Sequence, residues 1–477
     1  MPEIPKQNSN ATVAWLPDMI YTGGRFERGL ALVCDEDGRI RGLAREVDDA
    51  QRLVRLEGRA MLPGLVNAHS HAFQRVLRGR TERRTRAHDS FWTWREMMYS
   101  AATRLTPEDI YDASRMAFLE MVLGGITAVG EFHYIHHAAD GQPYAESNLM
   151  AKQVIRAARS VGLRIALLRV AYARSGYGKE PAPGQARFIE ADPEEYLRQL
   201  SQLDQELRRS DASRAWSGIA LHSIRALPFD YLRRVAQFTH RAGAKFPVHM
   251  HVAEQPAEIA ACMVEHGRSP VMLLEDLGLL NEQLTAIHAI HMTAEEALLM
   301  VQSGAGVCVC PTTERNLGDG IFPHGKLFLD EGGTLSLGTD SHAQIDLLED
   351  ARELELHMRL QNLERAVLAP TGEDGHSALA ARLFACASVG GAESIGARGA
   401  GRLEAGCPAD FFTVTLDDPS IAGAGTDDLL AGIVFSLSRT AIRQVFIGGR
   451  PVIEDGRHQA QREIVSRFDA LQKRLWG

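Results

Sequence analysis

Short apolar runs alternate with longer segments of helical periodicity through most of this chain. The apolar or β-branched runs lie near residues 61–66, 126–129, 164–170, 218–222, 246–251, 284–288, 306–310 and 334–337. Segments with an apolar position every three or four residues lie between them, at 107–123, 151–158, 193–207, 231–240 and 294–301. Eight strands that alternate with helices predict an α/β fold, a (β/α)8 TIM-type barrel.

Both ends of the chain lie outside this alternation. The chain has 477 residues, whereas a bare barrel needs about 250. Residues 13–60 read as short strands with glycine turns, and strands are again expected at 410–414 and 444–447. Neither end can build a core alone, so we expect one small β-sandwich assembled from both. The predicted division is 1–60 for its N-terminal part, 61–399 for the barrel, and 400–477 for its C-terminal part with a terminal helix.

Composition narrows the class of protein. Hydrophobic residues make up 45% and charged residues 24%, which is typical of a globular protein without membrane spans. The net charge of −9 argues against nonspecific nucleic-acid binding. Residues 1–11 are polar and lack an apolar signal core, so we expect a cytoplasmic protein. The six cysteines form neither a disulfide framework nor a thiolate zinc motif, and Cys308 and Cys310 are interpreted as small buried hydrophobes.

Candidate chemistry gathers where the predicted strands end. His69 and His71 close the first strand, and alternate residues of a strand share a face, so both imidazoles can bind one metal ion. His251, His288 and Asp340 end three later strands in the same manner. The C-terminal ends of barrel strands meet at one mouth, where such barrels carry their active sites.

These residues resemble the amidohydrolase superfamily, in particular its deaminase branch that uses one metal. The resemblance implies that His69, His71, His251 and Asp340 bind one divalent metal, expected to be Zn²⁺, although iron and manganese accept the same ligands. It further implies that Glu254, His288 and Asp340 are catalytic. The binuclear branch needs a lysine on the fourth strand, and residues 218–223 contain none.

Longer strings at residues 69–75, 89–95, 131–134, 249–255 and 316–323 resemble one family within this superfamily, the formimidoylglutamate deiminases. That resemblance implies hydrolytic deimination of N-formimino-L-glutamate to N-formyl-L-glutamate and ammonia, a step of histidine degradation. The implied substrate contacts are Gln74, Arg95, Tyr134, His222 and Arg225. The substrate is a small dianion, and paired guanidinium donors independently suit its two carboxylates.

Several alternatives stay open. Another mononuclear deaminase, with a guanine, adenosine-type or guanidine substrate, would share the metal ligands, and a noncatalytic metal-binding protein would share some of them. His249 is interpreted as a core or supporting residue, and His342 is left without a role. A basic stretch over residues 75–86 is interpreted mainly as a solvated loop. No nucleic-acid or membrane partner is expected, and a homodimer is compatible with the sequence.

Overall fold

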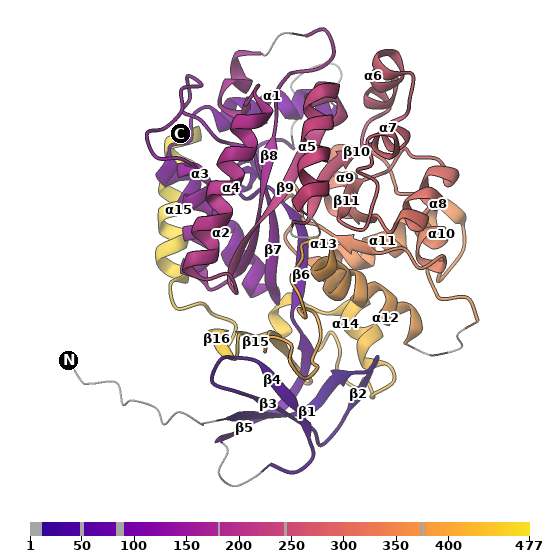
Figure 1. The fold of residues 1–477 in the computed structure, drawn as a ribbon. Helices are drawn as coiled ribbons and strands as arrows, with labels where there is room; N and C mark the ends of the chain where they lie inside the picture. The colour runs from indigo at the N-terminus through magenta and orange to yellow at the C-terminus, as the bar shows by residue number, and fades with distance from the viewer. Residues whose placement is uncertain are drawn as a thin grey trace, which may run out of the picture.

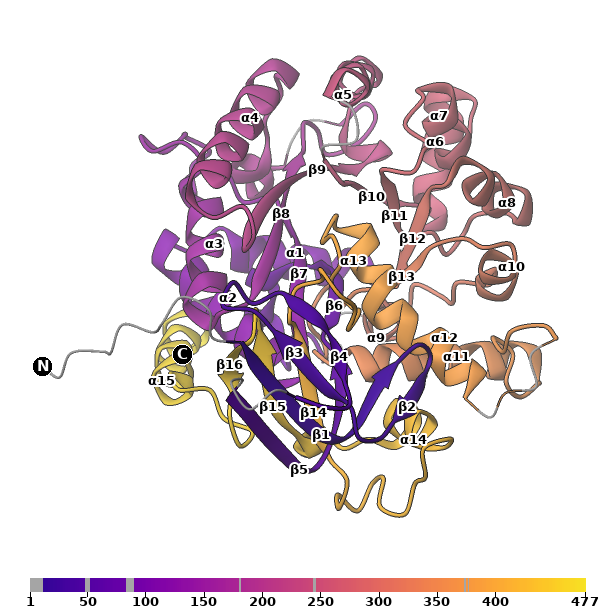
Figure 2. The same cartoon turned by 60° about the horizontal axis from the view of Figure 1, so that its bottom comes forward.

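The computed structural model describes residues 12–47, 52–82, 90–179, 182–242, 246–372, 375 and 377–477. These ranges exclude Arg83, Arg84 and Arg86 of the basic stretch, and also Asp89, the first residue of the string at 89–95. Within them the strands form two eight-stranded sheets (Figures 1 and 2). One sheet is the predicted barrel, and the other joins the two ends of the chain.

The barrel is built from parallel strands in sequence order. They are β6 (Leu65–Ser70), β7 (Ile126–His133), β8 (Arg164–Ala171), β9 (Ala215–Ser223), β10 (Val248–Val252), β11 (Leu284–His288), β12 (Gly306–Val309) and β13 (Leu335–Leu337). A parallel bridge between Ser70 and Asp340 joins the last strand to the first. There the Asp340 N–H donates to the His69 carbonyl at 3.0 Å, and the His71 N–H donates to the Asp340 carbonyl at 3.1 Å. The predicted (β/α)8 barrel is therefore confirmed.

Helices cover the outside of the barrel (Figure 2). The α-helices of the described residues, of which α13 lies at the end of the barrel and α14 beside β2 (Arg25–Glu27), are α1 (Phe91–Ala102), α2 (Pro107–Leu123), α3 (Leu149–Val161), α4 (Pro193–Ser210), α5 (Phe229–Ala242), α6 (Pro256–His266), α7 (Pro270–Asp276), α8 (Ala294–Ser303), α9 (Pro311–Leu317), α10 (Gly325–Asp330), α11 (Leu347–Asn362), α12 (Ala378–Ala385), α13 (Gly391–Ser394), α14 (Leu429–Ser436) and α15 (Gln461–Trp476). The five segments predicted as helices fall in α2, α3, α4, α5 and α8. Among the described residues, no helix is both long enough and apolar enough to cross a membrane.

The second sheet contains β1 (Val13–Thr22), β2 (Arg25–Glu27), β3 (Ala31–Cys34), β4 (Ile40–Ala44), β5 (Arg52–Pro63), β14 (Phe411–Thr415), β15 (Ile442–Ile447) and β16 (Arg450–Ile453). Antiparallel pairing of β14 with β5 joins the C-terminal strands to the N-terminal ones. Trp15 of β1 and Phe446 of β15 have ring centroids 5.7 Å apart, although two strands separate β1 from β15 in the sheet and neighbouring strands lie about 4.8 Å apart. The sheet therefore curls round its own core, so that its two halves face each other as the layers of a sandwich do.

The first barrel strand begins later than the sequence pattern suggested. Met61, Leu62 and Pro63 belong to β5 of the terminal sheet, and β6 starts at Leu65. The chain changes sheet at Gly64, whose N–H donates to the Asp410 carbonyl at 2.9 Å. A Cβ at this position would lie 2.2 Å from Thr127 Oγ1, so glycine permits the close crossing. The domain boundaries at 60/61 and 399/400 stay a prediction.

Candidate functional site

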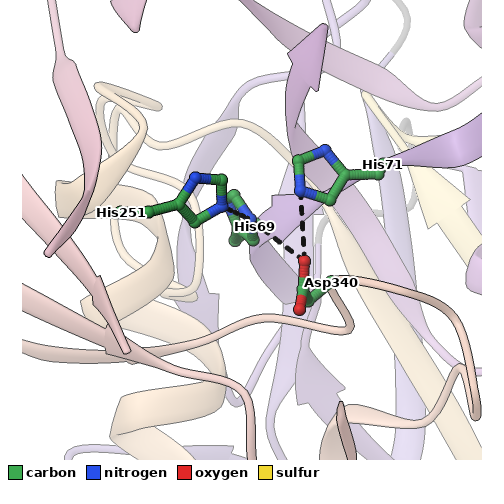
Figure 3. Close-up of side chains that lie close together, drawn as sticks. All are labelled: His69, His71, His251 and Asp340. Atoms are coloured by element: carbon green, nitrogen blue, oxygen red, sulfur yellow. Dashed lines mark hydrogen bonds and ion pairs between the residues drawn. The ribbon is translucent and has the colours of Figure 1, made fainter. Parts of the chain in front are cut away.

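Four side chains predicted as metal ligands meet at the C-terminal mouth of the barrel (Figure 3). His69 lies in β6, His71 follows that strand, His251 lies in β10, and Asp340 follows β13. Asp340 Oδ1 lies 3.3 Å from His69 Nε2 and 3.2 Å from His71 Nε2. His251 Nε2 lies 3.2 Å from His69 Nε2. One donor atom from each residue lies within 4.8 Å of the others, so the cluster could hold one metal ion.

The hydrogen bonds of the imidazoles fit a cation at this point. His71 Nδ1 lies 2.9 Å from the Phe132 carbonyl, and His251 Nδ1 lies 2.9 Å from the His222 carbonyl. A carbonyl oxygen accepts hydrogen bonds, so each Nδ1 carries the proton and each Nε2 directs a lone pair into the cluster. Burial lowers the pKa of His69 to about 3 and that of His251 well below its usual value. Neutral imidazoles beside a carboxylate are a suitable donor set for a divalent metal.

Backbone conformation marks the same mouth. Ala253, His288 and Asp340 have positive φ angles of 50°, 69° and 41°. Non-glycine residues in this region cost about 1–3 kcal/mol each and concentrate at active sites. All three lie at or just after the ends of barrel strands. The positive φ angles therefore occur at the mouth of the barrel, where His288 and Asp340 face the site.

Glu254 and His288, the predicted proton-transfer residues, face Asp340 from the adjacent strand ends. His288 Nε2 lies 3.7 Å from Glu254 Oε1 and 3.9 Å from Asp340 Oδ2. Burial raises the pKa of Glu254 to about 8, with His288 opposing the shift. Burial opposes charge on His288, but the carboxyl groups of Glu254, Glu314 and Asp340 outweigh it and raise the pKa of His288. The pair can therefore hold a proton at neutral pH.

Glu314 was not predicted from the sequence. It lies in α9, and its Oε1 is 3.2 Å from His288 Nδ1 and accepts the Cys310 N–H at 2.8 Å. The carboxylate thereby fixes the orientation of the His288 ring. A single glutamate in a short helix carries no sequence signal for such a role, because the contact depends on how α9 packs beside β11.

Three predicted substrate contacts lie beside the metal cluster. Gln74 Nε2 donates to the Tyr134 hydroxyl at 2.8 Å, and the Tyr134 ring packs edge-on against the His71 ring with centroids 5.1 Å apart. The His222 ring lies 5.2 Å from that of His251. Gln74 Oε1 is buried without a hydrogen-bond partner among the described residues, so it is free to accept one from a ligand.

The two predicted arginines lie against one aromatic side chain. The guanidinium of Arg95, in α1, is 4.5 Å from the centre of the Trp92 ring, and that of Arg225 is 5.9 Å from it. Arg225 Nη1 donates to the Ser175 carbonyl at 3.3 Å. Arg95 Nη1 is buried and has no hydrogen-bond partner in the part of the chain that the structure describes. The positive charge of Arg225 contributes, after burial, to lowering the pKa of Arg95, so the pair forms a cationic side of the site.

Two further histidines form hydrogen bonds within the protein and lie outside the metal cluster. His249 lies two residues before His251, but its Nε2 is 2.8 Å from the Ser394 carbonyl, below the mouth. His342 is held between Ser70 Oγ and Thr339 Oγ1, each 3.1 Å away. Neither belongs to the groups of potential metal donors found among the described residues.

Comparison with known proteins places this geometry in a family. The amidohydrolase family model matches residues 60–452. A formimidoylglutamate deiminase of Pseudomonas aeruginosa is 38% identical over 88% of this chain and 90% of its own. A 5-methylthioadenosine/S-adenosylhomocysteine deaminase of Natronomonas pharaonis is 30% identical over 85% of this chain and 84% of its own. The crystal structure of an amidohydrolase from Brucella melitensis superposes with a TM-score of 0.87 at 34% identity, covering 98% of this chain and 100% of that one. With its closed parallel barrel and its histidine and aspartate cluster, this chain belongs to the amidohydrolase family.

Proposed function

We propose that the protein hydrolyses N-formimino-L-glutamate to N-formyl-L-glutamate and ammonia, in histidine degradation. The observation that carries this proposal is the pair Arg95 and Arg225 on one side of the metal cluster. Among the described residues, neither guanidinium forms an ion pair with a carboxylate, and both contact Trp92. Half-buried guanidinium groups without an ion-pair partner suit a substrate that brings two carboxylates. The 38% identity to a formimidoylglutamate deiminase supports the same substrate.

We propose Zn²⁺ as the metal, held by His69, His71, His251 and Asp340. Three imidazole nitrogens and one carboxylate oxygen form a donor set that zinc accepts. Strand β9 carries no lysine that could bridge a second ion in the binuclear manner. When bound, such a metal lowers the pKa of a water molecule from about 15.7 towards 7.

The protein side chains would then move protons around the attacked carbon. The free oxygen of Asp340 takes the proton of the attacking water, and Glu254 delivers a proton to the imine nitrogen. His288, fixed by Glu314, donates a hydrogen bond to the oxygen that adds to the formimino carbon. The proton held by Asp340 then passes to the same nitrogen, and the added hydroxyl gives its remaining proton to the Glu254 carboxylate as the formyl C=O bond forms. The bond between carbon and the doubly protonated nitrogen breaks, ammonia leaves, and both carboxyl groups return to their starting protonation states.

A nucleoside deaminase is the second candidate, because a relative with that name is 30% identical over most of the chain. A neutral heterocycle would not pair with the charges of Arg95 and Arg225, which favours the dianionic substrate. A noncatalytic metal-binding protein would have no use for Glu254 and His288 beside the metal.

Ammonia release separates these candidates. We expect purified, metal-analysed protein to release ammonia from N-formimino-L-glutamate, with much lower kcat/KM for formimino-glycine, guanine and 5′-methylthioadenosine. Faster ammonia release from guanine or 5′-methylthioadenosine would contradict our proposal and favour a deaminase of purine compounds. Absence of release from every compound by metal-loaded protein would favour a noncatalytic role.

Replacement of either arginine tests the dianionic substrate directly. Removing the partner of a desolvated carboxylate costs about 2–5 kcal/mol, or about 30- to 5,000-fold in kcat/KM. We therefore expect Arg95→Ala and Arg225→Ala each to lose activity on this scale with unchanged metal content. Arg80→Ala removes an exposed arginine whose guanidinium lies 5.9 Å from the centre of the Trp476 ring; it serves as the control and should retain parental kcat/KM.

A substrate analogue lacking one carboxylate assigns the partners. It should lose little further activity in the variant whose arginine served that carboxylate, as in a double-mutant cycle. Parental kcat/KM for N-formimino-L-glutamate in both arginine variants would contradict the proposed substrate.

A further inference from the structure

The mouth of the barrel holds a second group of potential metal donors beside the predicted ligands. Cys310 follows directly after β12, and its thiol lies with donor atoms of His288 and Asp340, each within 4.8 Å of the others. All three residues are buried. We propose that Cys310, His288 and Asp340 form a second binding site for one thiophilic divalent cation, such as Cd²⁺ or excess Zn²⁺, and that its occupation inhibits the enzyme.

Strand order brings these donors together. His288 ends β11, Cys310 follows β12 and Asp340 follows β13, and these three strands are neighbours in the barrel. The Cys310 thiol lies beside Gly338, where a Cβ would approach its sulfur to 3.0 Å. Glycine at this position therefore leaves room for the thiol near Asp340.

The carboxylate of Asp340 can serve two ions because its oxygens face different partners. Oδ1 lies 3.3 Å from His69 Nε2 and 3.2 Å from His71 Nε2, on the side of the predicted metal. Oδ2 lies on the side of His288, 3.9 Å from Nε2. The two groups share Asp340 and no other residue, so the first metal need not leave before a second one binds.

The donor set selects soft cations. Zinc lies about 2.3 Å from thiolate sulfur and about 2.0–2.2 Å from nitrogen or oxygen, which places tetrahedral donors about 3.5 Å apart. The donors of this group lie within 4.8 Å of one another, so each pair needs to close by at most about 1.3 Å to reach that spacing. The Cys310 thiol gives its proton to solvent as the metal–sulfur bond forms. Thiolate favours cadmium and zinc over magnesium and calcium, and Glu254 Oε1, 3.7 Å from His288 Nε2, can supply a fourth ligand.

The second ion would inhibit the enzyme because it would occupy groups that the proposed reaction needs. It would engage His288 and the Asp340 oxygen that take part in the proposed reaction. This consequence rests on the proposed function, whereas the binding itself does not.

The test uses the full chain preloaded with one equivalent of Zn²⁺ and titrated with Cd²⁺. We expect a cadmium–thiolate charge-transfer absorption that saturates at one added equivalent, together with loss of ammonia release. Cys310→Ser should lose this absorption and need at least about tenfold more Cd²⁺ for half-inhibition relative to its own starting rate, since even groups that only support metal ligands contribute about 10- to 100-fold to affinity. Cys308→Ser, which changes a thiol of β12 that belongs to neither donor group, is the matched control and should behave as the parent chain.

Absence of a charge-transfer band in the parent chain overturns the proposal whatever the variants do. So does a band that persists in Cys310→Ser, or one lost equally in Cys308→Ser. If Cys310→Ser does not fold, Cys310→Ala removes the same thiol. A protein inactive on N-formimino-L-glutamate would contradict the proposed function, while the Cd²⁺ band would still decide the second site.

Discussion

His251→Ala will lose both the metal and turnover, while the parent chain holds one equivalent of divalent metal. The His251 ring supplies a lone pair that its hydrogen bond to the His222 carbonyl aims at the cluster. Removing one of four ligands leaves two imidazoles and one carboxylate, and we expect no detectable ammonia release. Metal analysis after dialysis and a steady-state assay measure both effects.

His249→Ala is the matched control for this substitution. His249 lies two residues earlier on the same strand, and its ring contacts Ser394 instead of the cluster. It should keep one equivalent of metal and measurable turnover, although loss of a buried ring lowers its melting temperature. Full activity with bound metal in His251→Ala, or loss of metal in His249→Ala, would show that the ligand assignment is wrong.

The same pair of histidines shows what a strand pattern can and cannot predict. Residues two apart share a face, so the period of a strand cannot choose between His249 and His251. They differ by about 6.6 Å along the strand, and only the later one reaches the mouth. The resemblance to the amidohydrolase superfamily selected His251 as the metal ligand, and the structure supplies a geometric reason for this selection.

Packing between separate elements accounts for what the sequence did not predict. Glu314 orients His288 from α9, and Trp92 of α1 contacts Arg225, which follows β9. Neither contact follows from local periodicity, because each depends on how a helix docks over the barrel mouth. The late start of β6 was not predicted either, because the continuous apolar run on both sides of Gly64 is divided between two different sheets.

The alternation of strands and helices was predictable for a simpler reason. Parallel barrel strands are buried on both faces and read as continuous apolar runs, as the fully buried β7 and β8 show. The terminal sheet was also predictable in outline, because neither end of the chain has enough apolar strand surface to form a core alone. The curl that brings Trp15 onto Phe446 depends on long-range pairing and was not.

Loss of proton delivery by Glu254 is expected to lower turnover strongly. Glu254→Gln keeps the shape of the side chain and removes its ability to transfer a proton to the leaving nitrogen. General acid catalysis contributes about 10²–10⁴-fold to rate, so we expect kcat to fall on that scale with metal content unchanged. Rapid chemical quantitation of ammonia and metal analysis of the same preparation measure the two quantities together.

Glu258→Gln tests whether the effect belongs to Glu254 itself. Glu258 is a second buried carboxyl group, and burial raises its pKa to about 7, but its Oε2 accepts the Glu254 N–H at 3.2 Å. Glu254 Oε1, by contrast, lies beside His288 at the metal cluster. A raised pKa without a position beside the reacting atoms cannot deliver the proton, because general acid catalysis requires hydrogen-bond reach. We therefore expect Glu258→Gln to retain far more turnover than Glu254→Gln, and the opposite order would move the proton donor to Glu258.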